Sequence, residues 1–84
     1  MEKENILSTL KSIAEPYVLD KERLNTYNEN TDFIKDLQIN SANLVDIVLD
    51  IEDTFDIEID DASMNRMVNV RDTIDVIQDK LQTS

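Results

Sequence analysis

The chain has 84 residues and contains no glycine. Glycine is the residue that most readily adopts the positive φ angles of tight hairpin turns, so a chain without it builds few such turns. An all-β fold, which joins many short strands through them, is therefore disfavoured. Hydrophobic residues make up 40% of the chain, enough for a compact core. At this length we expect a single small domain over residues 1–84.

Three segments carry hydrophobic residues at the three- and four-residue spacing of an amphipathic helix, at about 4–15, 41–56 and 70–81. A fourth, short helix is predicted at about 62–67, after a capping aspartate at position 60 or 61. The predicted fold class is all-α, a small bundle of three main helices plus one short helix, with a long first loop.

Helix ends also have local signals. Pro16 disfavours helical backbone at Glu15, so the first regular helix should end near Ala14 or Glu15. Asn69 is the expected N-cap of the last helix. The long loop between the first two helices should be anchored in the core by four hydrophobic residues: Leu24, Phe33, Ile34 and Leu37. Without glycine, left-handed backbone positions are expected at asparagine.

Eight basic and nineteen acidic residues give a net charge of −11. Nucleic acids and anionic membranes are therefore disfavoured as partners, and basic protein surfaces are favoured. The alternative is an acidic surface that only keeps the protein in solution. No apolar run approaches the ~20 residues of a membrane span, and the first residues lack the form of a signal peptide. We expect a cytoplasmic protein.

Residue types needed for common catalytic sites are missing. Without histidine and cysteine, catalytic triads and thiol nucleophiles are excluded, and no glycine-rich phosphate loop exists. The acidic residues between 50 and 61 do not form an EF-hand loop, because Phe55, Ile57 and Ile59 interrupt them and the central glycine is absent. The sequence predicts neither an enzymatic activity nor a dedicated metal site.

Ser41 stands where the strongest predicted helix begins. A serine there is exposed and close to the positive end of the helix dipole, which suits a phosphodiester. The alternative is a serine that only caps the helix. Along the same helix, Asp46, Asp50 and Asp53 form a stripe outside the core face. At about 100° per residue, the hydrophobic Val45 and Leu49 also project away from the core.

Residues 33–59 resemble the acyl carrier protein family. The resemblance includes Phe33, the Asp36-Leu37 pair, Ser41, and the helix end Glu52-Asp53-Thr54-Phe55, and it continues without a gap through Asp61, Met67, Val70, Ile74 and Ile77. Three positions depart from the family pattern: Asn40 replaces its aspartate, Ala42 its leucine, and Gln38 stands near its usual glycine. We therefore expect a specialised member of the family.

The resemblance implies that Ser41 carries covalent 4′-phosphopantetheine, transferred from coenzyme A by a Mg²⁺-dependent carrier-protein synthase (phosphopantetheinyl transferase). The resulting phosphoprotein would carry acyl groups as thioesters between enzymes of fatty-acid, lipid or polyketide biosynthesis. The reactions themselves would be carried out by the cofactor and the partner enzymes. The alternatives are an aminoacyl carrier of the D-alanyl type, or an acidic helical adaptor without the arm.

Two further sets of residues follow from this hypothesis. The chain is expected to be a monomer. Partner enzymes with basic docking patches would bind at Asn40, Ala42, Val45, Asp46, Leu49, Asp50, Glu52 and Asp53. The acyl group would lie in a pocket formed by Leu44, Val48, Phe55, Ile59, Met64, Met67, Val70 and Ile74, which are also what a hydrophobic core requires.

Overall fold

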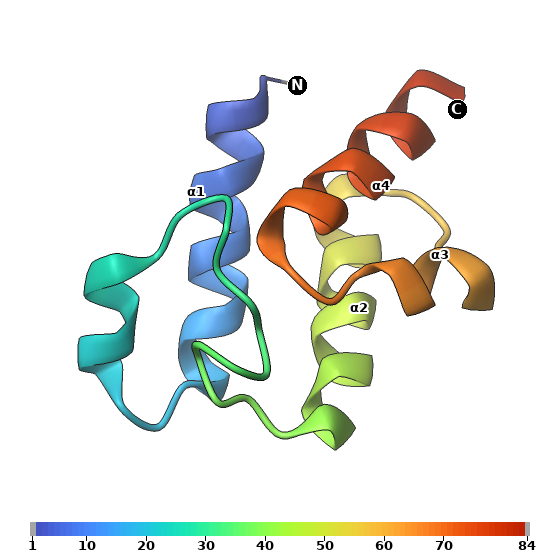
Figure 1. Cartoon of the computed structure of the whole chain (residues 1–84). Helices are drawn as coiled ribbons and strands as arrows, with labels where there is room; N and C mark the ends of the chain where they lie inside the picture. The colour runs from blue at the N-terminus through green and yellow to red at the C-terminus, as the bar shows by residue number, and fades with distance from the viewer. Residues whose placement is uncertain (1, 84) are drawn as a thin grey trace.

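The computed structural model describes residues 2–83, and these residues form helices and loops without a β-strand (Figure 1). The prediction of an all-α bundle with three long helices and one short helix is confirmed. Residues 2–83 contain no helical stretch with the length and hydropathy of a membrane span. The α-helices are α1 (Lys3–Ala14), α2 (Ser41–Phe55), α3 (Asp61–Arg66) and α4 (Val70–Thr83), and two 3₁₀ helices, η1 (Glu15–Tyr17) and η2 (Lys21–Thr26), follow α1.

Helix boundaries follow the local signals in the sequence. Regular helix α1 ends at Ala14, close to the predicted end, and Pro16 lies in η1; Glu15 itself nevertheless keeps right-handed helical backbone (φ −50°, ψ −46°), against the expectation for a residue before proline. The side chain of Asp60 accepts the backbone N–H of Ser63 at 3.2 Å and caps α3. Asn69 accepts the N–H of Asp72 at 2.8 Å at the start of α4. The capping predictions for Asp60 and Asn69 are therefore confirmed.

Left-handed backbone occurs at Gln38 (φ 53°) and Asp56 (φ 54°), so the expectation that asparagine would take these positions is wrong. Asp56 follows the last residue of α2, where a left-handed residue commonly ends a helix. Gln38 stands between Leu37 and Ile39, which are both buried. A left-handed residue between them turns the chain so that both neighbours reach the core.

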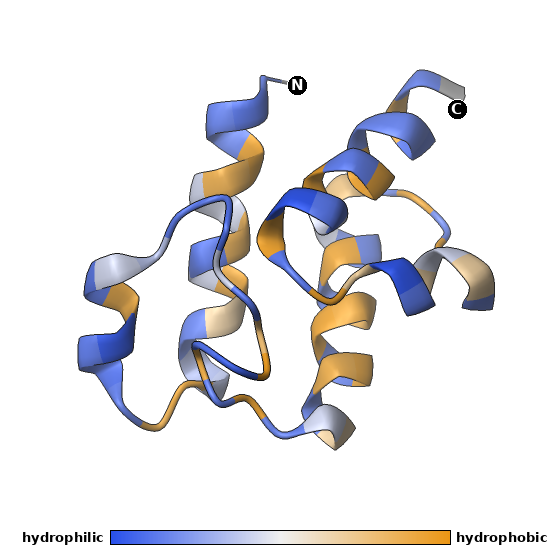
Figure 2. Ribbon diagram, in the orientation of Figure 1, coloured by the Kyte–Doolittle hydropathy of each residue, from blue (hydrophilic) through white to orange (hydrophobic). Residues whose placement is uncertain are grey.

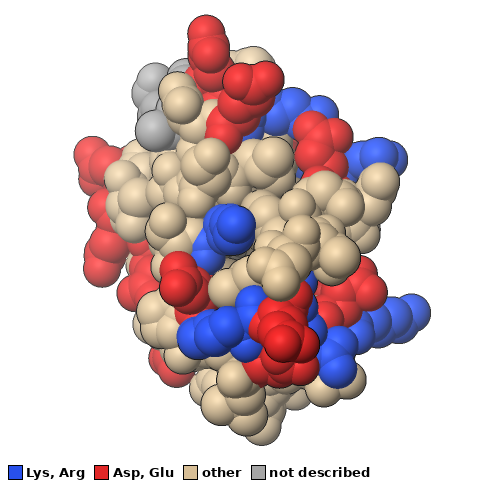
Figure 3. Space-filling model, turned by 90° about the vertical axis from the view of Figure 1, so that its left-hand side faces the viewer, with Lys and Arg blue, Asp and Glu red and all other residues tan. Residues whose placement is uncertain are grey.

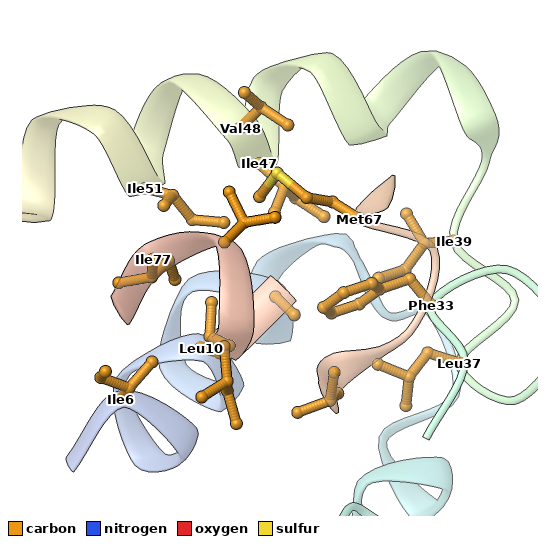
Figure 4. Packing of buried hydrophobic residues seen from close by; sticks show 14 of the residues in the cluster. Ile6, Leu10, Phe33, Leu37, Ile39, Ile47, Val48, Ile51, Met67 and Ile77 are labelled. Atoms are coloured by element: carbon orange, nitrogen blue, oxygen red, sulfur yellow. The ribbon is translucent and has the colours of Figure 1, made fainter. Parts of the chain in front are cut away.

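The core lies where α1, α2 and α4 face one another, and Figure 2 shows hydrophobic residues on these inner faces. Figure 4 shows side chains from all three helices meeting there, together with Phe33, Leu37 and Ile39 from the long loop. Ile34, expected as a loop anchor, is 41% exposed, and the neighbouring Ile39 is buried instead. The loop shows no helical or strand periodicity, so its sequence did not indicate which of the two isoleucines would be buried.

The long loop is fixed to the start of α4 by backbone pairing. Phe33 donates its N–H to the carbonyl of Val68 at 3.2 Å, and Val70 donates to the carbonyl of Thr31 at 2.9 Å. The Arg71 guanidinium adds a 2.8 Å bond to the side-chain oxygen of Asn30. These contacts hold Phe33 against the connection between α3 and α4, and so help to build the site described below.

Candidate functional site

Ser41 is the first residue of α2, and its side chain is exposed. The cap of this helix is Asn40, whose side-chain oxygen accepts the N–H of Ala42 at 2.9 Å. The alternative that Ser41 serves as the cap is therefore wrong. The first turn of α2 contains no acidic residue, so the positive end of the helix dipole is not offset by a carboxylate there. An anionic ester on the Ser41 hydroxyl would be favoured at this position.

A cavity of about 240 Å³ opens beside Ser41, between α2, α3 and the start of α4. Exposed lining residues mark its mouth, and buried ones its interior. Most of the lining is aliphatic, aromatic or methionine, so the cavity suits an apolar group. Its twelve lining residues are Phe33, Ser41, Leu44, Val45, Ile47, Val48, Ile51, Met64, Asn65, Met67, Val68 and Thr73.

The predicted acyl-pocket residues divide into two equal groups. Leu44, Val48, Met64 and Met67 line the cavity, whereas Phe55, Ile59, Val70 and Ile74 do not. The latter four pack in or against the hydrophobic core away from this opening.

The cavity also has lining residues that the sequence did not predict for the acyl pocket. Phe33 arrives through the loop pairing, and Val68 and Thr73 come from around the start of α4. No spacing rule links these three positions. Ile47 and Ile51 could have been found, because they lie on the same periodic face of α2 as Leu44 and Val48.

Charge is distributed unevenly along the chain. Residues 36–65 contain nine of the nineteen acidic residues and none of the eight basic ones, so they carry −9 of the net charge of −11. Among residues 2–83, no ion pair between a basic and an acidic side chain involves a residue of α2. Lys and Arg side chains gather instead among acidic ones on the face that carries α1 and η2 (Figure 3).

Most of the predicted docking residues lie on the exposed side of α2. Val45 is 50% and Leu49 54% exposed, among the exposed carboxylates of Asp46, Asp50 and Asp53. Asn40 and Ala42 are exposed at the start of the helix. These seven residues therefore form one outward surface, here called the docking surface. It combines hydrophobic side chains with carboxylates that take part in none of the ion pairs seen in residues 2–83.

Glu52 differs from the other predicted docking residues. Its side chain is partly buried, and its Oε2 accepts the N–H of Ile59 at 2.8 Å. This bond ties the loop after α2 back to the helix. The structure therefore gives Glu52 a role in holding the α2–α3 connection.

Two ionisable groups near α2 and α3 have shifted pKa values. Partial burial raises the pKa of Tyr17, and the hydrogen-bonded Asp50 carboxylate and the charge of Asp46 raise it further. Hydrogen bonds from the Ser63 hydroxyl and N–H lower the pKa of Asp60, with a smaller effect from Lys80.

Among the described residues, no three acidic side chains are grouped to hold a metal ion.

A family model described as a phosphopantetheine attachment site matches residues 18–77. The chain is also 34% identical over 83 residues to the acyl carrier protein of Coprothermobacter proteolyticus, an alignment that covers 99% of each protein. The chain belongs to the acyl carrier protein family. The prediction of the family and of phosphopantetheine as its cofactor is thus confirmed.

Other members of the acyl carrier protein family agree in length and fold. The acyl carrier protein of Lactobacillus acidophilus is 34% identical over 79 residues, which cover 93% of this chain and 95% of that protein. The crystal structure of an acyl carrier protein from Thermotoga maritima superposes with a TM-score of 0.77 at 28% identity, over 99% of this chain and 94% of that one. The similarity therefore includes the first 32 residues, where the sequence alone indicated only a helix and a loop.

The departures from the acyl carrier pattern have visible structural consequences. Asn40 keeps the capping bond that an aspartate would make, but without its charge. Gln38, near the usual glycine, adopts the left-handed conformation that glycine takes most easily. With both departures present, Ser41 lines the cavity. The residues around Ser41 therefore fit a phosphodiester-linked arm.

Proposed function

We propose that the chain carries acyl groups as thioesters on 4′-phosphopantetheine attached to Ser41, and that it has no enzymatic activity of its own. The observation that supports this most directly is the position of Ser41. It is exposed, is not needed as the helix cap, and lies on the lining of an apolar cavity. The prosthetic group would supply the thiol that this chain lacks.

Each part of the chain has a separate task in this proposal. Ser41 provides the hydroxyl oxygen for the phosphodiester, and the start of α2 stabilises the negative charge of the linkage through the helix dipole. Asn40 fixes the start of α2 by capping it. The cavity shelters an apolar cargo from water and from nucleophiles, because its buried lining is almost entirely hydrophobic.

The docking surface would recognise partner enzymes, including the carrier-protein synthase that modifies Ser41. Exposed carboxylates mainly raise the association rate and set the register with a basic partner, and Val45 and Leu49 supply the apolar centre of the contact. Such contacts are weak enough to break after each transfer. A monomer that moves between enzymes of fatty-acid, lipid or polyketide biosynthesis in the cytoplasm fits this arrangement.

Intact mass spectrometry tests the attachment site. Incubation with coenzyme A, Mg²⁺ and a carrier-protein synthase is expected to add one phosphopantetheine to the wild type and none to Ser41→Ala. Ser8→Ala, which changes an exposed serine on α1, is the matched control and should be modified like the wild type. An unmodified wild type would favour the adaptor without an arm, and a modified Ser41→Ala would move the site elsewhere.

A further inference from the structure

Tyr17 lies beside the docking surface but comes from another part of the chain. It is the last residue of η1, and its phenol donates a hydrogen bond to Oδ2 of Asp50 on α2 at 3.2 Å. Partial burial and Asp50 raise the pKa of this phenol, and the charge of Asp46 raises it further, so Asp46 also lies near. One aromatic ring and two carboxylates therefore meet at the same place on the surface.

The backbone on both sides of Tyr17 is fixed. Pro16 has a restricted φ angle, and Val18 donates its N–H to the carbonyl of Glu15 at 3.1 Å, which closes the turn. The side chain of Val18 is buried in the core. The ring of Tyr17 is itself half-buried against this core. A ring held in this way loses little freedom when another molecule packs on it.

The two carboxylates beside Tyr17 have no basic partner within residues 2–83. Neither Asp46 nor Asp50 takes part in an ion pair there. Lys21, the first basic residue after Tyr17, donates a hydrogen bond to the carbonyl of Glu15 instead. A cation from a partner would therefore meet both carboxylates without displacing an ion pair of this chain.

The arrangement favours one kind of cation. The guanidinium of arginine is planar, carries several N–H donors and stacks on aromatic rings, whereas the ammonium of lysine is compact and strongly hydrated. Asp46 and Asp50 are four residues apart on α2, so their side chains are neighbours. A guanidinium can donate to both carboxylates while one of its faces lies on the ring of Tyr17.

We propose that Tyr17 completes, together with Asp46 and Asp50, a binding place for an arginine side chain of a partner enzyme. The inference rests on the proposed function, because the partner is an enzyme that docks to reach Ser41. It goes further by naming the partner's residue and by assigning a task to a residue outside α2. The alternative is that Tyr17 only ties η1 to α2, and then its loss would affect arginine and lysine partners equally.

The test compares two peptide probes on the unmodified chain. One is an amphipathic helical peptide with leucine and arginine on one face, and the other has lysine at every arginine position. Tyr17→Leu should weaken binding of the arginine peptide by about two- to fivefold, and binding of the lysine peptide by less than about twofold. Isothermal titration calorimetry measures both at low salt, because salt screens exposed charges. Equal weakening of both peptides, weakening of neither, or no binding to the wild type would overturn the inference.

Two further variants separate the ring from the phenol and from general effects. Tyr17→Phe keeps the ring and should retain most of the preference for arginine. Tyr27→Phe is the matched control, because the phenol of Tyr27 donates to the carbonyl of Leu7 at 2.8 Å and to no residue of α2. It should bind both peptides like the wild type. Circular dichroism checks that each variant folds.

A direct measurement keeps the inference testable if Tyr17→Leu does not fold. In Tyr27→Phe, Tyr17 is the only tyrosine of the chain. Nuclear Overhauser contacts are expected between its ring protons and the δ-methylene protons of the bound arginine peptide. Their absence from a complex that forms would overturn the inference.

Intact mass spectrometry of the same wild-type protein separates this inference from the proposed function. A preference for arginine that depends on Tyr17, together with a Ser41 that a carrier-protein synthase does not modify, would refute the proposed function and leave the arginine place standing. A modified Ser41 without this preference would refute the inference and leave the proposed function standing.

Discussion

The phenol of Tyr17 donates a hydrogen bond to the carboxylate of Asp50 across 3.2 Å. The bond joins the end of the first helical segment to the exposed side of α2. It also keeps one carboxylate of the docking surface in a fixed position, without neutralising its charge. Because the acceptor is ionised, this contact should be stronger than one between neutral groups.

The Tyr17–Asp50 contact predicts a late titration of Tyr17. Its pKa is raised above the ordinary 10.0 by partial burial, by Asp50 and by Asp46. The folded state thus holds this proton more tightly than the unfolded state. Its contribution to stability is complete below pH 10 and is lost as the pH rises through the folded-state pKa.

Ultraviolet absorbance of tyrosinate measures this titration, in a Tyr27→Phe background because burial also raises the pKa of Tyr27. In that background, Asp50→Asn should lower the pKa of Tyr17 while leaving it above the ordinary value, since the effect of burial remains. An unchanged titration after Asp50→Asn would show that the two side chains do not interact in solution.

Asn40 should be worth about 1 kcal/mol to the folded state as the cap of α2. Asn40→Ala is expected to lower the free energy of unfolding by that amount, measured by urea denaturation. Asn40→Asp keeps the capping oxygen and adds a charge that the helix dipole favours, so it should be at least as stable as the wild type. Asn25→Ala, at an exposed position in η2, is the control and should have little effect. Equal losses at both asparagines would exclude a specific cap.

Gln38 should be a site where glycine stabilises the protein. A residue with a Cβ in the left-handed region is strained by about 1 kcal/mol or more, and Gln38→Gly removes this strain at the cost of a more flexible unfolded chain. We expect a net rise of about 0.5–1 kcal/mol in the free energy of unfolding. The same substitution inside α4, Gln78→Gly, should lower it by about 1 kcal/mol. A loss of similar size in both variants would contradict the strain at Gln38.

Local sequence patterns predicted the helices well because each pattern belongs to one helix. The periodic residues of 41–56 place Val45 and Leu49 outside the core, and both are half-exposed. Pro16 and the caps at Asp60 and Asn69 also act within a few residues of their own positions. Such signals can be read without knowing the tertiary structure.

The cavity could be predicted only in part because it is assembled across the chain. Half of its walls come from α2, but Phe33 is brought in by backbone bonds between the long loop and residues 68–71. Backbone pairing of this kind depends little on side chains. The left-handed position at Gln38 was missed for a similar reason, because the burial of both of its neighbours, rather than its own preference, determines its conformation.

Asp60 should contribute to stability in a pH-dependent way. Hydrogen bonds from Ser63, and the charge of Lys80 at 3.7 Å, lower its pKa below the ordinary 3.8. A carboxylate with a lowered folded-state pKa stabilises the fold above the unfolded-state value, and this contribution is lost as the pH falls through the folded-state pKa. Asp60→Asn should therefore be less stable than the wild type near neutral pH and equal to it in strong acid.

Urea denaturation at several pH values measures this difference, with Asp61→Asn as the control. Asp61 is the exposed neighbour and forms none of the ion pairs seen in residues 2–83. Its replacement should change stability less at neutral pH. If the stability difference between Asp60→Asn and the wild type instead grew as the pH falls, its pH dependence would have the opposite sign. That result would refute the explanation.

Charge reversal at chosen positions distinguishes a specific role of the docking surface from a general effect of net charge. Asp46→Lys with Asp53→Lys changes two exposed carboxylates of the docking surface. The pair Glu4→Lys and Asp75→Lys changes the net charge equally, on α1 and α4. If a synthase binds the docking surface, the first pair should raise the KM for modification of Ser41 by about tenfold, or roughly 1.4 kcal/mol for two exposed contacts. The second pair should have a much smaller effect, and both proteins should keep the helical circular dichroism of the wild type. Equal KM values for the two pairs would mean that the acidic side of α2 contributes only general charge to the encounter.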